Sequence, residues 1–252
     1  MCQLLAMNCN VPTDIVFSFT GLSSRSNEHA DCFGIAFFEV RGLRSLVDVT
    51  SAAPSPVAEL VRSYPIRSTN VIAHIRKATV GRIALENCHP FVRELWGHYW
   101  VFAHNGDVPS FKPVLHGGFR PVGDTDSELT FCWIMQELAK NHADVPSPVA
   151  LRETLRELAA MVRPHGTFNF VLSNGRALWA HCSTKLWYLE RRHPFQAAHL
   201  QDEDVTVDFA QVTTRNDRVA VVVTEPLTVD ERWTAFESGQ LEVFVDGELL
   251  AE

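Results

Sequence analysis

The sequence lacks the features of a membrane, secreted or repetitive protein. No stretch approaches the roughly 20 consecutive apolar residues that a membrane-spanning helix needs. The N-terminal segment has neither a basic region nor an apolar run long enough for a signal peptide, and no internal repeat follows it. The composition, 46% hydrophobic and 21% charged over 252 residues, is that of an ordinary globular protein, so no membrane partner is expected.

Cations are scarce as well. Lys and Arg total 22 against 30 Asp and Glu, which gives a formal net charge of -8. A nucleic-acid-binding surface needs a local excess of cations, and only scattered pairs such as Arg191–Arg192 are present. The charge distribution therefore predicts no nucleic-acid partner.

Cysteines are few and irregularly spaced. They form no CxxC pair and no zinc-finger pattern with histidine, and they lie at Cys2, Cys9, Cys32, Cys88, Cys132 and Cys182. In a chain of this length, such spacing is typical of reduced thiols in a cytoplasmic protein. The 11 histidines show no HxH or HExxH arrangement, so the sequence predicts no metal site.

The order of the expected elements favours an α+β fold. Strands are expected at residues 3–8, 33–40, 44–50, 71–76 and 99–104, and in a series from residue 167 to residue 245. Helices are expected at residues 13–23, 55–64, 126–140 and 148–162. Because the last two helices are consecutive and do not alternate with strands, we expect antiparallel sheets with helices in outer layers.

Cys2 is a candidate nucleophile because removal of Met1 would leave it at the N-terminus. An α-amine, with an ordinary pKa of about 7.7–8.0, is suited to act as a general base at neutral pH. One residue would then carry both the nucleophile and its base, as an N-terminal Thr does in other hydrolases. The structural alternative is a small buried residue at the start of a strand.

Two further candidates follow apolar runs. Arg76 ends the run 71–75, and its planar guanidinium can hold a substrate carboxylate through two parallel hydrogen bonds. The alternative is a surface arginine paired with a nearby acid. Asn105 and Gly106 follow the run 99–104, where a side-chain amide and a backbone N–H can donate to a developing oxyanion. The alternative is a plain Asn-Gly turn.

Asp126 begins the helix expected at residues 126–140. Thr125 and Glu128 have the spacing of a capping box, and an acid in the first turn is stabilised by the helix dipole. Asp126 therefore has a structural explanation, and it is also a candidate acceptor for a substrate ammonium. His89 is expected to be a core or loop histidine, although a Cys–His pair with Cys88 or Cys132 stays open.

Five segments follow one another along the chain: Cys2, HIRKAT (74–79), HPF (89–91), HNG (104–106) and GDTDSE (123–128). Their order resembles the glutaminase domain of class II glutamine amidotransferases. MCQLLAMNCNVPTDIVFSFTGL and RIALENCHPF are similar to a short, stand-alone branch of this family. The resemblance implies the four-layer αββα sandwich of N-terminal-nucleophile hydrolases, formed by two antiparallel sheets flanked by helices. It extends from residue 1 to about residue 245, so one domain spanning residues 1–252 is expected.

The resemblance also implies roles. Cys2 is the nucleophile and its α-amine the base, acting directly or through a water. Arg76 binds the α-carboxylate of glutamine with Thr79 in the same pocket, and Asp126 binds the α-ammonium. Asn105 and Gly106 form the oxyanion hole. The thiolate displaces ammonia, and water then hydrolyses the γ-glutamyl thioester to glutamate. No metal or organic cofactor is implied.

The sequence departs from the family pattern at two places. Val80 stands where many members have histidine, and Cys32-Phe33 stands where Gly-Trp is expected between Asp31 and Gly34. These departures concern loop geometry and substrate fit, because none of these positions belongs to the implied catalytic set.

Three functions stay open at this point. The chain has no segment left to use ammonia, so it is expected to be a glutaminase that supplies a separate ammonia-accepting partner protein. Alternatively, it hydrolyses a glutathione-like γ-glutamyl amide, whose glutamyl end presents the same groups to Arg76 and Asp126. The third possibility is a non-catalytic module that senses glutamine. The presence of Cys2, Asn105 and Gly106 favours an enzyme.

Overall fold

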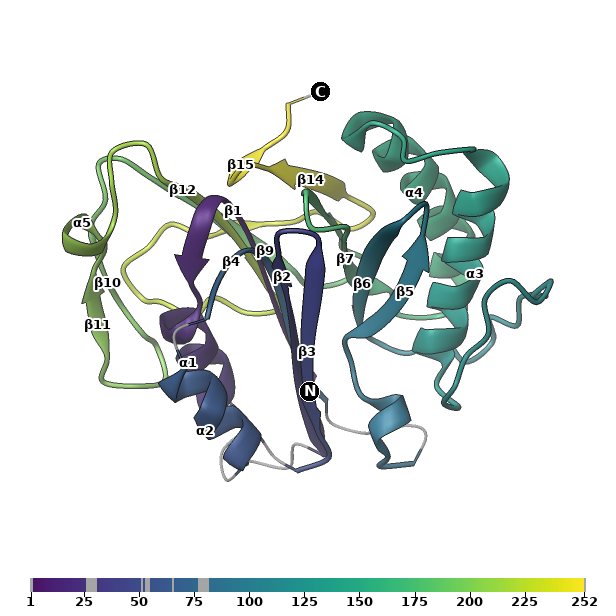
Figure 1. Cartoon of the computed structure of the whole chain (residues 1–252), viewed down its shortest axis with the longest axis horizontal. Coiled ribbons are helices and arrows are strands. Elements are labelled where there is room, and N and C mark those ends of the chain that lie inside the picture. The colour runs from purple at the N-terminus through teal and green to yellow at the C-terminus, as the bar shows by residue number, and fades with distance from the viewer. Residues whose placement is uncertain are drawn as a thin grey trace.

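The computed structural model describes residues 2–25, 31–50, 52, 55–64, 66–76 and 82–251. Within these residues, two antiparallel sheets face each other between two outer groups of helices (Figure 1). The first sheet has the spatial order β13 (Thr234–Ala235), β9 (Trp187–Arg192), β12 (Arg218–Val223), β1 (Gln3–Asp14), β4 (Arg67–Arg76), β2 (Cys32–Glu39) and β3 (Gly42–Asp48).

The second sheet packs against the first. Its order is β15 (Glu248–Leu249), β14 (Leu241–Val245), β8 (Ala177–His181), β7 (Asn169–Ser173), β6 (His98–Asn105) and β5 (Phe91–Leu95). A separate two-stranded ribbon is formed by β10 (Ala197–His199) and β11 (Thr206–Asp208).

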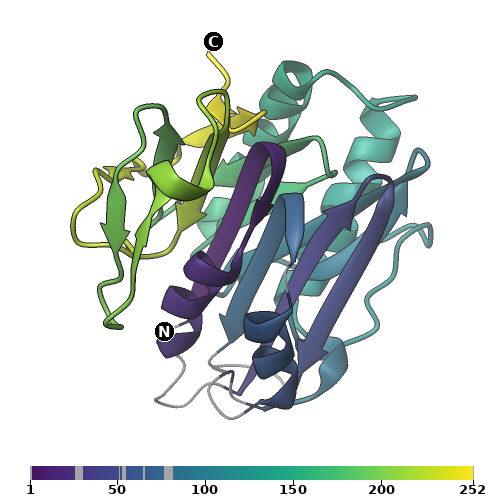
Figure 2. The ribbon, with the colours of Figure 1, turned by 60° about the vertical axis from the view of Figure 1, so that its left-hand side comes forward.

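Helices cover the outer face of each sheet. On the first sheet lie α1 (Val16–Ser24) and α2 (Pro56–Ser63), which Figure 2 shows in front of the strands. On the second lie α3 (Asp126–Asn141) and α4 (Pro148–Val162). Short helices complete the described elements: η1 (Leu85–Asn87), η2 (Arg163–His165) and α5 (Phe209–Val212). None of the described helices is long and apolar enough to cross a membrane.

The helices and sheets form four layers, and three clusters of apolar side chains fill the spaces between them. In β1, Leu5 and Met7 pack under α1 and α2, whereas Leu4 and Ala6 point into the space between the sheets. A third cluster, which includes Phe102 of β6, fills the space under α3 and α4. The predicted α+β fold with an αββα order of layers is therefore confirmed.

Most element boundaries agree with the sequence-based expectation, but the first helix begins later than expected. β1 continues to Asp14, past an irregularity in its pairing with β4 between Asn8 and Thr13. The Asp14 carboxylate accepts a 2.7 Å hydrogen bond from the N–H of Val16, and the N-cap residue of the shortened helix is Ile15. Pairing with β4 therefore extends the strand beyond its apolar run.

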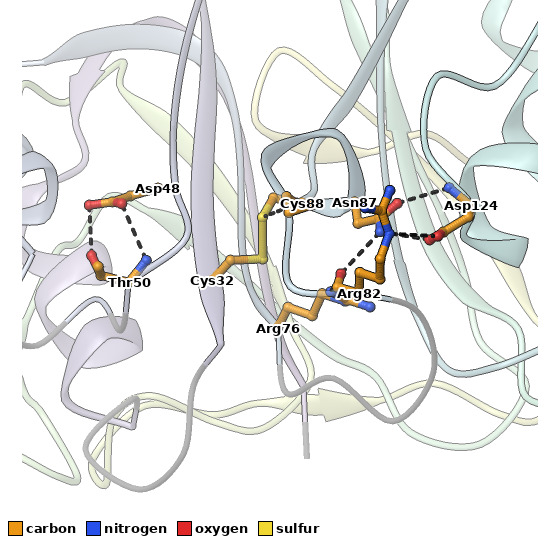
Figure 3. The surroundings of a disulfide bond; sticks show 9 residues. Cys32, Asp48, Thr50, Arg76, Arg82, Asn87, Cys88 and Asp124 are labelled. Carbon is orange, nitrogen blue, oxygen red and sulfur yellow. Dashed lines mark hydrogen bonds and ion pairs between the residues drawn. A yellow bond between two sulfur atoms is a disulfide. The ribbon is translucent and has the colours of Figure 1, made fainter.

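The expectation of six reduced cysteines is wrong for one pair. Cys32, the first residue of β2, forms a disulfide with Cys88, which follows η1 (Figure 3). Their Cα atoms are 6.2 Å apart. The two residues are separated by 56 positions and belong to no spacing motif, so the sequence alone gave no indication of this pairing.

Candidate active site

Predicted site residues from four distant segments line one small cavity at an end of the space between the sheets. Cys2 precedes β1, Arg76 ends β4, Gly106 follows β6 and Asp126 begins α3. The cavity has a volume of about 30 Å³ and is also lined by His74, His89, His104, Asp107, Thr125 and Ser127. Thr79 and Val80 lie outside the described residues.

Arg76 is a buried side chain of this cavity rather than a surface arginine. It is 5% exposed, and its Nη1 donates to the carbonyl oxygen of Arg82 at 3.3 Å. His74 and Ile72, two and four residues earlier in β4, point to the same face of the strand as Arg76, and Ile72 lies in the apolar layer between the sheets. Alternation along the strand thus directs Arg76 toward the second sheet.

The side-chain amide of Asn105 is committed at both of its hydrogens. Nδ2 donates to the carbonyl oxygen of Cys2 and to the hydroxyl of Thr224, each at 3.0 Å. The backbone carbonyl of Asn105 accepts a third bond, from Nδ2 of Asn169, also at 3.0 Å. The end of β6 is therefore tied to the segment that carries Cys2.

Gly106 occupies a backbone position that only glycine fits. Its φ is +145°, and a Cβ added there would lie 2.1 Å from the carbonyl oxygen of Thr167. The chain turns tightly here, and the N–H of Thr167 donates to the carbonyl of Asp107 at 3.0 Å. The turn is more than a plain Asn-Gly connection, because it brings a backbone segment to the wall of the cavity.

Asp126 serves the fold and also faces the cavity. Its Oδ2 accepts a 2.6 Å bond from the N–H of Val108, so its carboxylate supports the chain after Gly106. The threonine half of the expected capping box is confirmed, since Thr125 Oγ1 accepts from the N–H of Glu128 at 3.2 Å. The Glu128 carboxylate instead accepts from the N–H of Gly123 at 2.7 Å and pairs with Arg93 at 2.5 Å.

Three buried histidines form part of the cavity wall. Burial lowers the pKa of His74 to about 3 and also lowers the pKa of His89 and His104. The rings of His74 and His89 are in contact, with centroids 4.4 Å apart and planes tilted by 41°. His104 Nε2 faces the carbonyl of Thr167 at 2.9 Å, so it carries the proton, and Nδ1 accepts from the Ser127 hydroxyl at 2.8 Å. These three histidines are therefore neutral at ordinary pH.

Sequence and structure comparisons agree with this geometry. The family model of class II glutamine amidotransferases matches residues 1–252. The chain belongs to the class II glutamine amidotransferase family. It is 47% identical over 252 residues to the Escherichia coli "Putative glutamine amidotransferase YafJ", covering 98% of this chain and 99% of that protein. A "Putative glutamine amidotransferase" of Haemophilus influenzae is 47% identical over 255 residues, covering 100% of this chain and 87% of that protein.

Solved structures support the same assignment. A crystal structure described as a "predicted glutamine amidotransferase" from Pseudomonas aeruginosa has a TM-score of 0.81 and 42% identity, with 100% of both chains covered. The glutamine phosphoribosylpyrophosphate amidotransferase of Bacillus subtilis has a TM-score of 0.60 at 13% identity, covering 100% of this chain and 49% of that one. At that identity the second likeness shows the fold alone.

Within this amidotransferase, the Cys–His alternative does not hold for Cys88, which is bonded to Cys32. Cys132 lies beside Arg93, whose Nη2 is 3.5 Å from its sulfur, and it does not line the cavity. His89 is 4% exposed and its ring contacts the ring of His74, as expected for a core histidine. Sequence reasoning missed that this core histidine borders the cavity.

A larger hollow lies elsewhere on the amidotransferase and holds none of the predicted site residues. It has a volume of about 270 Å³ and lies beside β9, β10 and α5. Arg191 forms two bonds of 2.6 and 2.7 Å with the Glu231 carboxylate there, and its guanidinium lies 4.4 Å from the centre of the Phe209 ring. These contacts satisfy the arginine within the fold. No group of potential metal ligands was found among the described residues.

Proposed function

We propose that this amidotransferase hydrolyses the amide of glutamine, or of another γ-glutamyl compound, through a thioester on Cys2. The ammonia is released to a separate acceptor protein. The observation that carries the proposal is the meeting of Cys2, Arg76, Gly106 and Asp126 at one cavity. A nucleophile, a cation, backbone donors and a carboxylate are the groups that an α-amino acid amide requires.

In the proposed reaction, Cys2 is the first residue after loss of Met1. Its α-amine takes the thiol proton, and the sulfur attacks the γ-carbonyl carbon. The N–H of Gly106 and the side-chain amide of Asn105 stabilise the resulting oxyanion. Collapse breaks the carbon–nitrogen bond, and the amine returns the proton to the leaving ammonia. Water then attacks the thioester, which gives glutamate and restores the thiol.

The charged groups suit the two ends of the glutamyl moiety. The Arg76 guanidinium is proposed to bind the α-carboxylate and Asp126 the α-ammonium, with Thr79 beside them. Arg76 is 5% exposed, so water screens its attraction for a carboxylate only weakly. Oδ2 of Asp126 accepts from Val108, and Oδ1 accepts only a long 3.5 Å bond from the Ser127 hydroxyl, so Oδ1 is the oxygen proposed to bind the ammonium. The reaction requires no cofactor.

The cavity volume bears on the rate. The described wall leaves about 30 Å³, less than a glutamine side chain fills, so we propose that part of the wall moves when substrate binds. We therefore propose that the isolated chain turns over free glutamine slowly. A partner protein, or a larger γ-glutamyl amide such as a glutathione-like peptide, raises the rate by stabilising the open site.

A substrate panel tests this function. The purified chain is incubated with glutamine, glutathione and γ-glutamyl anilides, and glutamate and amine are measured, with Cys2→Ser as the inactive control. Glutamate release that requires Cys2 supports the proposal, and the preferred amide distinguishes glutamine from a glutathione-like substrate. Glutamine binding without hydrolysis of any amide, alone or with a partner recovered from lysate, would identify a sensing module instead.

We further propose one amidotransferase domain over residues 1–252, the range that the family model matches, and a cytoplasmic location. A reducing cytoplasm would keep Cys32 and Cys88 as thiols, so the redox state of this pair in the cell tests the proposed location. Rapid acid quenching of cells followed by alkylation and mass spectrometry measures whether the pair is oxidised where the protein resides.

A further inference from the structure

Thr224 connects three chain segments at the candidate active site. It follows the last residue of β12 and is 1% exposed. Its hydroxyl oxygen accepts from the N–H of Leu4 and from Nδ2 of Asn105, each at 3.0 Å. Its own N–H donates to the carbonyl of Leu4 at 3.1 Å. One side chain thus contacts the start of β1 and the end of β6.

The hydroxyl changes how the sheet ends. In the register of β1 with β12, Leu5 lies opposite Val223, so Leu4 lies opposite Thr224. The Leu4 N–H is bonded to the hydroxyl of Thr224, which takes the place of a backbone carbonyl in the ladder. The regular pairing of the two strands stops at Leu4, two residues after Cys2.

The same hydroxyl fixes the side chain of Asn105. A hydroxyl oxygen has two acceptor sites, and the Leu4 and Asn105 donors use both. The Asn105 amide is held at two points, by Thr224 in the first sheet and by the Cys2 carbonyl. Its rotation about χ2 would break both bonds.

We propose that Thr224 is a positioning residue for the reaction, acting through Asn105. While one hydrogen of the Asn105 amide leaves the Cys2 carbonyl for the oxyanion, the bond to Thr224 stays in place and keeps the amide aligned. Because the Leu4 N–H is bonded to the same hydroxyl oxygen, Thr224 holds the start of β1 and the oxyanion donor at a fixed position relative to each other. This inference rests on the proposed function.

The matched variants are Thr224→Val, which removes the hydroxyl at nearly constant volume, and Thr224→Ser, which keeps it. With the γ-glutamyl amide that the wild type hydrolyses, Thr224→Val lowers kcat at least about tenfold and leaves KM within about threefold. Thr224→Ser stays within about threefold of the wild type in both constants. Thr228→Val is the control, since Thr228 is also buried and hydrogen-bonded, but its partners are Glu231 and Trp233.

A double-mutant cycle separates positioning from a general structural role. In an Asn105→Ala background, Thr224→Val lowers kcat by less than about twofold, because the group through which it acts is missing. A full additional loss in that background overturns the proposal. An unchanged kcat in Thr224→Val, or an equal loss in Thr224→Ser, also overturns it. If both Thr224→Val and Thr224→Ala fail to fold, the hydroxyl serves the fold rather than Asn105, and the proposal is wrong.

A measurement without substrate keeps this inference separate from the proposed function. The side-chain NH₂ of Asn105, assigned by its loss in Asn105→Ala, is followed by NMR hydrogen exchange. Protection is retained in Thr224→Ser and falls at least about tenfold in Thr224→Val. If the variants show these protection values but the wild type hydrolyses no amide, the proposed function is refuted while the contact between Thr224 and Asn105 is supported. Unchanged protection in Thr224→Val refutes the positioning contact itself.

Discussion

The side-chain amide of Asn105 donates a 3.0 Å hydrogen bond to the carbonyl oxygen of Cys2, 103 positions earlier in the chain. Asn105 ends a strand of the second sheet, and Cys2 precedes the first strand of the other sheet. The bond therefore crosses between the sheets at the cavity. This contact holds the residue of the proposed nucleophile next to the proposed oxyanion donor.

A glutamine-like electrophile is expected to label Cys2 of a chain that has lost Met1. Cys9, Cys132 and Cys182 are buried, and burial raises the pKa of each thiol, for Cys9 to about 12. These three thiols therefore hold little thiolate at neutral pH. Intact mass and peptide mapping measure both points. Full activity in protein that retains Met1 contradicts the α-amine as base, and labelling at Cys132 contradicts Cys2 as the nucleophile.

Arg76→Lys is expected to weaken substrate binding although the charge is kept. Lysine cannot supply the two parallel donors of a guanidinium, and losing one charged hydrogen bond costs about 1.5–3 kcal/mol. The effect is expected in KM more than in kcat if the contact is equal in the ground and transition states. Arg82→Lys is the control, since the Arg82 side chain is 74% exposed. A large loss of kcat at constant KM in Arg76→Lys would be the opposite result.

Gly106→Ala is expected to destabilise the protein. The substitution forces a Cβ to within 2.1 Å of the Thr167 carbonyl at a φ of +145°. Backbone strain of this kind costs about 1–3 kcal/mol, before the clash is counted. Gly118→Ala is the matched control because a Cβ there meets nothing within 4 Å. Urea unfolding of both variants measures the difference, and equal free energies of unfolding would show that the turn tolerates a side chain.

Reduction is expected to lower the stability of the protein. The Cys32–Cys88 disulfide spans 56 positions, for which loop-closure entropy predicts about 4 kcal/mol of stabilisation as an upper value. A reductant is therefore expected to lower the Tm of the wild type and leave that of the Cys32→Ser/Cys88→Ser double variant unchanged. Thiol titration in denaturant gives the number of oxidised cysteines. A Tm insensitive to reductant in protein with an intact disulfide contradicts this prediction.

Mild acid is expected to destabilise the fold through the buried histidines. Burial lowers the pKa of His74 from 6.5 to about 3, so below pH 6.5 the unfolded chain takes up a proton that the folded chain does not. Above pH 6.5 both states leave this histidine unprotonated, so it does not lower the free energy of unfolding. The free energy of unfolding falls by up to about 1.4 kcal/mol per pH unit per histidine as the pH drops toward the folded-state pKa.

Urea unfolding between pH 7 and pH 5 measures this slope. His74→Asn is expected to remove the contribution of one histidine from the slope of the free energy of unfolding against pH, whatever its effect on the absolute stability. His98→Gln is the control because the His98 side chain is exposed. An unchanged slope in His74→Asn would mean that His74 is protonated in the folded protein.

Local signals in the amino-acid sequence were enough to predict most helices and strands and to identify the motifs. Residues 148–162 are helical as predicted because their signals are local: Pro148 begins the helix, and the Ser147 hydroxyl accepts from the N–H of Ala150 at 3.2 Å. Apolar runs likewise specified β4 and β6, and strand alternation then fixed the faces on which Arg76 and Asn105 lie.

Which side chains contact one another across the molecule could be learned only from the tertiary structure. The Thr224 contacts to Leu4 and Asn105 span 220 and 119 positions, and the Cys32–Cys88 disulfide spans 56. No local pattern specifies such pairs, because they depend on the path of the chain through both sheets. The same holds for the contact between the rings of His74 and His89, which burial makes neutral. Composition and spacing identified the candidate chemistry, whereas its alignment follows from packing between segments far apart in the chain.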